Sequence, residues 1–208
     1  YRSKTSLARL VSRELDTGEE FQVSTPDMDG FGDWNVHISH DEQKMAYIRI
    51  RYANSEIYIA NADGSDAKKV ADLNGYTPTL SWAPNDESIY WVDVGTTKLS
   101  KYHLATGETE QVDFATEKYH NRAYTVDLFD DKYLVAATLP EEQQIRRIDV
   151  TTGKVLQFAN LPKDELLATP LGQADSYLFV HDRLKPSLWR YENSVSTKLG
   201  LLDGIDFN

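Results

Sequence analysis

The chain has 208 residues, of which 40% are hydrophobic and 26% are charged, and its formal net charge at pH 7 is −11. Such an acidic chain repels phosphate backbones, so the charge predicts no direct contact with nucleic acid. The absence of cysteine excludes disulfides and thiol chemistry, and no apolar run approaches the roughly 20 residues of a membrane-spanning helix.

The first segment with a regular apolar pattern surrounds the sequence Asp16-Thr17-Gly18, which is typical of a hairpin turn. We expect one strand before this turn and one after it. A helix over Ser6–Leu15 is the alternative, because the apolar residues there also fit a helical spacing. The following segment, Asp27–Asp33, is rich in Gly and Asp and is expected to be a loop.

Short alternating apolar runs separated by turn residues continue to the end of the chain and predict antiparallel meandering strands. The proline at position 170 weakens one of them. The expected strands are Trp34–His40, Met45–Arg51, Ile57–Ile59, a run ending at Val70, Thr79–Trp82, Ile89–Val92, Lys98–Thr106, a run through Val112 and Phe114, Tyr124–Leu128, Tyr133–Ala137, Ile145–Val150, Val155–Phe158, Leu166–Leu171, Tyr177–His181, Leu188–Tyr191 and Val195–Leu201.

Turn glycines mark an internal repeat. Gly18, Gly64, Gly107 and Gly153 recur at intervals of about 45 residues, with similar strand–turn–strand text around each. Four strands in such a period are typical of a β-propeller blade, whose faces are buried by neighbouring blades. We therefore expect an all-β, partial or fragmentary β-propeller with about four full blades plus half a blade. The prediction is one domain, 1–208, with units of about 1–30, 31–74, 75–117, 118–163 and 164–203.

Large aromatic side chains in the strands are expected to pack one blade against the next. They are Tyr58, Trp82, Trp91 and Trp189. The chain starts without Met, and its last residues are too few to complete another blade. We therefore expect either a fragment or a partial propeller that covers its open edges by self-association.

Two stretches between Ser55 and Val92 carry a specific pattern. They are Ile57-Tyr58-Ile59 with Asn61-Ala62-Asp63-Gly64-Ser65, and Leu80-Ser81-Trp82-Ala83-Pro84-Asn85-Asp86 with Ile89-Tyr90. This pattern resembles the TolB-type propeller repeat, and the match is weak outside this region. Ala83 and Asn85 depart from the usual Ser and Asp, and Asp86 stands where the family has a turn glycine.

The resemblance supports the propeller fold, and we expect this propeller to be a non-catalytic binding or sensing module. Repeats of this kind also form the C-terminal, extracytoplasmic part of membrane-anchored winged-helix transcription regulators of the ToxR and CadC type. A periplasmic or extracytoplasmic location would follow, with the membrane anchor and the DNA-binding part outside this chain, while a cytoplasmic location stays open. The alternatives are an accessory propeller of a prolyl-peptidase-like hydrolase and a cell-envelope scaffold, as TolB itself is.

Motifs of catalysis are absent from the sequence: it has no Gly-x-Ser-x-Gly elbow, no phosphate-binding loop and no dinucleotide fingerprint. We therefore expect no enzyme activity, no catalytic residue and no cofactor. His37 and His40 would point to opposite faces of a strand, which makes them poor metal ligands together. The sequence Asp27-Met28-Asp29-Gly30 lacks the first carboxylate and the last glutamate of a calcium loop, so we expect no metal site.

In a propeller, the loops that enter the innermost strands surround one mouth of the central channel, and rigidly held loops are where binding residues gather. Aromatic and charged residues lie side by side on these loops, which suits contact with a protein or a small ligand. Ordinary polar loop composition is the alternative explanation. The candidate binding residues are Asp33, Trp34, Tyr76, Thr77, Tyr119, His120, Arg122 and Asp164.

Overall fold

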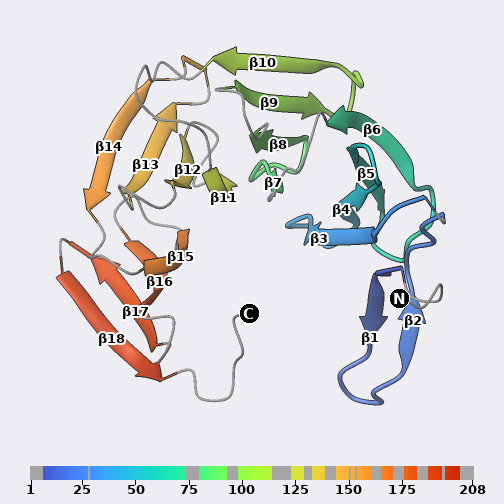
Figure 1. Ribbon diagram of the computed structural model, residues 1–208, viewed down its shortest axis with the longest axis horizontal. Helices are drawn as coiled ribbons and strands as arrows, with labels where there is room; N and C mark the ends of the chain where they lie inside the picture. The colour runs from blue at the N-terminus through green and yellow to red at the C-terminus, as the bar shows by residue number, and fades with distance from the viewer. Residues whose placement is uncertain are drawn as a thin grey trace. The chain divides into compact units, whose positions relative to one another are not determined.

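The computed structural model describes residues 7–27, 29–73, 80–92, 98–113, 123–128, 133–138, 144–149, 151–152, 154–160, 165–170, 176–181, 187–193 and 195–201. In these ranges the chain is all-β, with four four-stranded antiparallel sheets and one two-stranded sheet (Figure 1). They contain no helix long and apolar enough to cross a membrane. This is a partial β-propeller of four full blades and half a blade, as the repeat predicts.

Every four-stranded sheet is a meander in which strands that follow one another in sequence are neighbours. The half blade contains β1 (Val11–Arg13) and β2 (Glu20–Gln22), and the first full sheet contains β3 (Gly32–Ile38), β4 (Lys44–Ile50), β5 (Ser55–Asn61) and β6 (Lys68–Leu73). The second contains β7 (Leu80–Trp82), β8 (Ser88–Val92), β9 (Lys98–His103) and β10 (Thr109–Asp113). The third contains β11 (Ala123–Leu128), β12 (Tyr133–Thr138), β13 (Gln144–Asp149) and β14 (Val155–Asn160). The fourth contains β15 (Glu165–Pro170), β16 (Ser176–His181), β17 (Ser187–Glu192) and β18 (Val195–Leu201).

Three local expectations differ from the structure. The helical alternative for Ser6–Leu15 is wrong, because Val11–Arg13 is a strand that pairs with β2. The strand expected from Trp34 already begins at Gly32, so Asp33 and Trp34 lie in β3 and not in a loop. Pro170 is the last residue of β15, an edge strand of its sheet, and edge strands tolerate a missing N–H.

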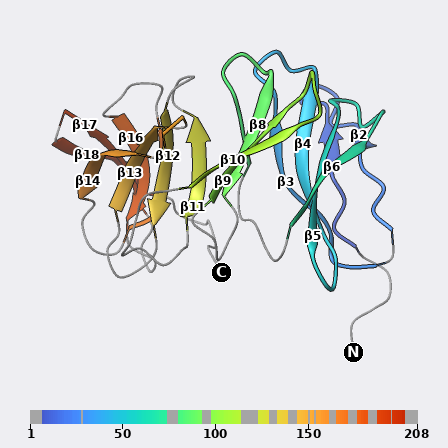
Figure 2. The ribbon, with the colours of Figure 1, turned by 90° about the horizontal axis from the view of Figure 1, so that it is seen from above.

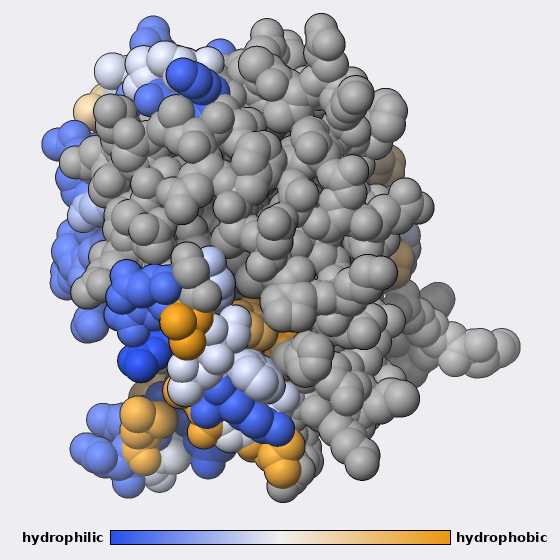
Figure 3. Space-filling view, turned by 90° about the vertical axis from the view of Figure 1, so that its left-hand side faces the viewer, coloured by the Kyte–Doolittle hydropathy of each residue, from blue (hydrophilic) through white to orange (hydrophobic). Residues whose placement is uncertain are grey.

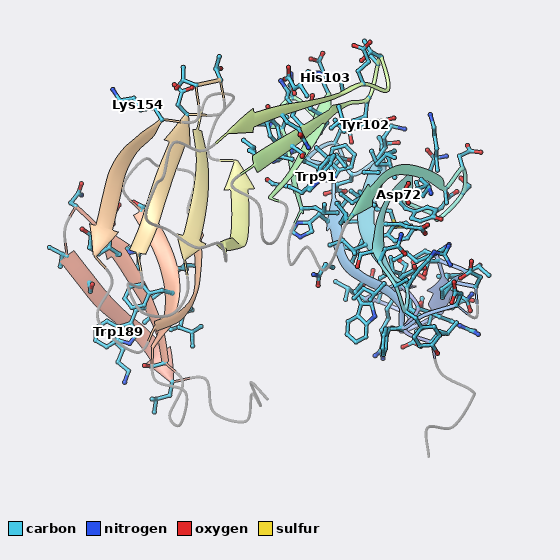
Figure 4. All side chains as sticks on the ribbon, turned by 45° about the horizontal axis from the view of Figure 1, so that its top comes forward. Asp72, Trp91, Tyr102, His103, Lys154 and Trp189 are labelled. Carbon is cyan, nitrogen blue, oxygen red and sulfur yellow. The ribbon has the colours of Figure 1, made fainter. Side chains whose placement is uncertain are left out.

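The chain divides into two compact units, one made of Tyr1–Val94 and Ser100–Glu110 and the other of Gly95–Leu99 and Gln111–Asn208. In the first unit, the β3–β6 and β7–β10 sheets share one hydrophobic core. Figure 4 shows Trp91 and Tyr102 on the β7–β10 sheet, and both belong to this core. Its buried members are Ala46, Ile48, Ile57, Leu73, Leu80, Trp82, Ile89, Trp91 and Tyr102. The predicted packing of Trp82 and Trp91 between blades is confirmed; the expected unit bounds and the single domain stay predictions.

Polar contacts also join the same two sheets. The indole of Trp82 donates a hydrogen bond to the backbone oxygen of His37 at 2.9 Å. The carboxylate of Asp86 accepts the backbone N–H groups of His40 and Asp41, each at 2.9 Å. Asp86 has a φ of 57°, which aspartate tolerates better than most residues. Here a side chain that caps the neighbouring turn replaces the glycine of the repeat.

The opposite face of the β3–β6 sheet is covered by the N-terminal segment. Leu10 and Val23 pack against a second core of Met45, Tyr47 and Ala60, and the β1–β2 hairpin lies beside the sheet in Figures 1 and 2. Tyr58 packs on this face and stacks on the Tyr47 ring at 5.5 Å, so it faces the half blade. The sheet is therefore buried on both faces, as a blade requires.

Gly64 shows how closely this segment approaches. Its φ is +88°, and a Cβ there would lie 2.1 Å from the backbone oxygen of Val23. No larger residue fits without moving the backbone. The glycine of the repeated turn thus serves two purposes: it supplies a positive φ and it leaves room for the N-terminal chain.

In the second unit, aromatic stacking occurs within the fourth sheet. Trp189 of β17 stacks on Phe179 of β16 with ring centroids 6.2 Å apart, and Phe179 is buried. The expected contact of Trp189 with another blade stays a prediction. Hydrophobic atoms reach the surface on the side of the molecule where β18 lies (Figure 3), and Val195, Leu199 and Leu201 of that strand are exposed.

Candidate binding surface

A row of charged residues crosses all four strands of the first full sheet. Asp33 of β3 pairs in register with Arg49 of β4, Arg49 with Glu56 of β5, and Glu56 with Asp72 of β6. The row lies at the edge of the sheet where β3 and β5 begin and β4 and β6 end. We call this the entry edge. Figure 4 labels Asp72 at the outer end of the row.

A buried ion pair starts the row. Arg49 donates from Nε to Asp33 Oδ1 at 2.7 Å and from Nη2 to Oδ2 at 2.9 Å. The Asp33 side chain is 0% exposed and that of Arg49 is 11% exposed. The hydrogen bond to Asp33 raises the pKa of Arg49 although burial opposes the shift, so the guanidinium stays charged. It also lies over the Tyr58 ring, 4.4 Å from the centroid.

Two more cations at the entry edge are held by carboxylates. Arg51 binds Asp27 at 2.6 Å and Glu56 at 2.7 Å, and Lys69 binds Asp72 at 2.9 Å. Hydrogen bonds to Asp27 and Glu56 raise the pKa of Arg51, and the same contact with Arg51 lowers the pKa of Asp27. The two pairs of Arg51 fix the end of β4 to the segment before β3 and to β5, while Lys69 and Asp72 both lie on β6.

Three exposed rings lie close to these charged residues in the sequence. Phe31 precedes β3, Trp34 lies within it, and Tyr52 belongs to the β4–β5 turn; they are 37%, 47% and 70% exposed. Phe31 and Tyr52 meet edge to face at 5.5 Å, and the Trp34 indole donates to the Phe31 backbone oxygen at 3.3 Å. We call these three residues the aromatic patch.

Backbone contacts fix the loop that carries Phe31. Its N–H donates to the Ile50 oxygen at 2.7 Å, and its own oxygen accepts the Ala8 N–H at 3.0 Å. A Cβ at Gly30 would lie 2.2 Å from the Ile50 oxygen, so this approach requires glycine. The patch is therefore held by main-chain contacts as well as by ion pairs.

The structure places only two of the candidate residues predicted from the sequence. Trp34 lies in the aromatic patch, whereas its neighbour Asp33 points to the other face of β3 and forms the buried ion pair with Arg49. The other candidates lie outside the described residues: Tyr76, Thr77, Tyr119, His120, Arg122 and Asp164. Sequence reasoning missed Tyr52, although an aromatic residue in a short turn between two apolar strands is a usable signal.

Other polar clusters in the described ranges look structural. Ser88 Oγ lies 3.3 Å from His103 Nδ1, and His103 Nε2 lies 3.0 Å from Glu110 Oε1. This order of groups looks like a catalytic triad, but Ser88 is 3% exposed, so its oxygen is covered. In the same ranges no group of three or more His, Asp or Glu residues could hold a metal ion.

No family model matches the chain, and no curated protein matches it. Among solved structures, TolB from Acinetobacter baumannii is 16% identical to this chain, with a TM-score of 0.73. The match covers 96% of this chain and 51% of the TolB chain. A putative TolB from Agrobacterium tumefaciens is 15% identical, with a TM-score of 0.73. The match covers 95% of this chain and 76% of the Agrobacterium chain. The acylaminoacyl peptidase of Pyrococcus horikoshii is 12% identical, with a TM-score of 0.58. The match covers 82% of this chain and 32% of the peptidase chain.

At these identities the likeness shows the fold alone. The chain has a TolB-like β-propeller fold, which agrees with the resemblance of the repeat. It spans about half the length of the first TolB structure and a third of the peptidase.

Proposed function

We propose that this chain is a non-catalytic binding module and that the aromatic patch is its contact surface for a protein or small ligand. The observation that carries the proposal is the gathering of three exposed rings on one rigidly held edge. Aromatic residues dominate the binding energy of protein interfaces, and exposed clusters of them in soluble proteins mark such sites.

The contacts that hold the patch in place favour binding. Phe31 is tied to β4 by its backbone, and Arg51, the neighbour of Tyr52, is bound by Asp27 and Glu56. A partner therefore meets rings whose positions are already set, which lowers the entropic cost of association. In this proposal Trp34 touches the ligand, and the ion pair of Asp33 with Arg49 holds β3, the strand that carries Trp34.

The wider role that we propose is that of a sensor: an extracytoplasmic domain that reports a ligand to a regulator. A TolB-like fold and a formal net charge of −11 support it. The acidic charge disfavours DNA contact by this chain, so the DNA-binding part would belong to another segment. In this proposal the membrane anchor also belongs to another segment. A scaffold role in a cell-envelope complex would use the same patch, and co-purification with a lipoprotein partner would distinguish it.

The direct test compares patch variants with a matched surface control. Trp34→Ala and Tyr52→Ala each remove one exposed ring, and Leu15→Ala removes a side chain from a residue that is 94% exposed on the β1–β2 turn. Immobilised variants are incubated with envelope extracts and a metabolite panel. We expect the two patch variants to lose partners that the native chain and Leu15→Ala retain. Equal capture by all four proteins would contradict the proposal.

The second candidate is an accessory propeller of a peptidase, which the structural likeness to acylaminoacyl peptidase favours. The full reading frame separates the two. A catalytic α/β-hydrolase segment with a Gly-x-Ser-x-Gly elbow after the propeller would support the peptidase, whereas a winged helix and a membrane span before it would support the sensor.

A further inference from the structure

We propose that the aromatic patch receives a lysine or arginine side chain from a basic segment of a protein partner. This inference rests on the proposed binding function and names the chemistry of the ligand. It follows from the charges that surround the patch and from the electrostatics of aromatic faces.

The cations near the patch are already paired with carboxylates. Arg49 is bound by Asp33, Arg51 by Asp27 and Glu56, and Lys69 by Asp72 and Glu56. Three cations thus face four carboxylates in this part of the described structure, which leaves the entry edge negative.

Exposure increases this imbalance at the surface. Among the cations, the side chains of Arg49 and Arg51 are 11% and 17% exposed and that of Lys69 is 43% exposed. Among the carboxylates, those of Asp27 and Asp72 are 57% and 62% exposed, whereas those of Asp33 and Glu56 are 0% and 8% exposed. An approaching partner therefore meets two exposed carboxylates and one exposed ammonium group, that of Lys69. An acidic partner would be repelled at this edge, and the net charge of −11 extends the same preference over longer distances.

The rings add an attraction that is specific for cations. The face of an aromatic ring carries partial negative charge and attracts an ammonium or guanidinium group placed over it. Tyr52 is 70% exposed and Trp34 is 47% exposed, so both offer surface to a partner. Arg49 over the Tyr58 ring, at 4.4 Å, is a contact of the same kind inside this sheet. A basic side chain over the Tyr52 ring would also be attracted by the exposed carboxylate of Asp27, which is bound to Arg51, the neighbour of Tyr52.

The test measures the affinity of fluorescently labelled peptides by anisotropy at low ionic strength. Peptides of one length carry lysine, arginine, glutamine or glutamate at the same positions. We expect the lysine and arginine peptides to bind and the glutamine and glutamate peptides to bind at least tenfold more weakly. Tyr52→Ala should raise the Kd of the basic peptides about two- to fivefold, the range of one exposed cation–π contact. Tyr52→Phe, which keeps the ring, and Leu15→Ala should leave the Kd unchanged.

Asp27→Asn gives an independent measurement. It should weaken binding of the basic peptides and reduce the dependence of Kd on salt, because one attractive charge is removed. Circular dichroism of each variant checks that the fold is kept, and the exposure of Tyr52 and Asp27 makes them suitable for substitution.

The outcomes separate this inference from the proposed function. Equal binding of the glutamine peptides, or a Kd of the basic peptides that Tyr52→Ala does not change, would overturn the inference. Free spermidine binding as tightly as the peptides would overturn the assignment to a protein partner. If a neutral or acidic ligand binds and the patch variants weaken it, the inference fails and the proposed function stands. If no ligand depends on the patch, both fail.

Discussion

Trp82 offers a sharp test of how neighbouring blades stabilise each other. Its side chain lies in the core shared by the β3–β6 and β7–β10 sheets, with 4% of the residue exposed. Its indole N–H also donates to the His37 oxygen at 2.9 Å, across from one sheet to the other. Two substitutions separate these contributions: Trp82→Phe removes the donor and keeps most of the apolar surface, and Trp82→Ala removes both.

We expect Trp82→Phe to lower the free energy of unfolding by about 1–3 kcal/mol, because a partly buried carbonyl loses its indole donor. Trp82→Ala should cost about 3–5 kcal/mol, since it also leaves a cavity between the two sheets. A buried residue without a hydrogen bond to the neighbouring sheet would lose free energy of unfolding only through the cavity.

The assay is equilibrium unfolding in urea, followed by circular dichroism. Leu15→Ala serves as the surface control and should change the free energy of unfolding by less than about 0.5 kcal/mol. The reasoning would be refuted if Trp82→Phe behaved like this control, or if Trp82→Ala cost no more than Trp82→Phe.

The remaining predictions concern a buried charge, a glycine and an acid-sensitive contact. Asp33→Asn should cost about 3–5 kcal/mol in urea unfolding because Arg49 keeps a buried charge without its ionised partner; a loss below about 1 kcal/mol would contradict this. Gly64→Ala should destabilise more than Gly107→Ala: both glycines have positive φ, but an added Cβ lies 2.1 Å from a backbone oxygen at Gly64 and 3.6 Å from a tyrosine hydroxyl at Gly107. Equal thermal melting shifts would contradict the close approach. For Asp86, burial alone would raise the pKa, but hydrogen bonds from the neighbouring turn outweigh it and hold the pKa below the usual 3.8. The contact therefore stabilises the fold above that pH and is lost as the pH falls through the lower value. Asp86→Asn should reduce the loss of melting temperature below pH 4, and an unchanged acid profile would contradict this.

The fold was open to prediction because its signals are local. Alternating apolar residues and turn glycines mark strands and hairpins within a few residues of each other, and their repetition indicates blades. Trp82 could be assigned to the contact between blades because a large ring on the face of a short apolar strand is expected to be buried by the neighbouring blade. Gly64 was correctly placed in a turn, but its close approach to Val23 depends on a segment some 40 residues earlier and carries no local signal.

The candidate site was harder to predict because register and burial determine it. Asp33 looks like an exposed loop residue in the sequence, yet β3 begins one residue before it and its pairing with Arg49 buries it. Asp86 looks like a departure from the repeat, and only the position of the neighbouring turn explains it. Tyr52 joins the patch because two separate turns meet at one edge of the sheet, which the sequence does not show.

Hydroxyl-radical footprinting of the chain with saturating lysine peptide tests the central claim most directly, since it reports the solvent exposure of individual side chains. The account predicts that oxidation of Trp34 and Tyr52 falls on binding while that of Leu15 stays unchanged. Protection elsewhere on the chain, with Trp34 and Tyr52 oxidised as before, would contradict the aromatic patch as the binding surface.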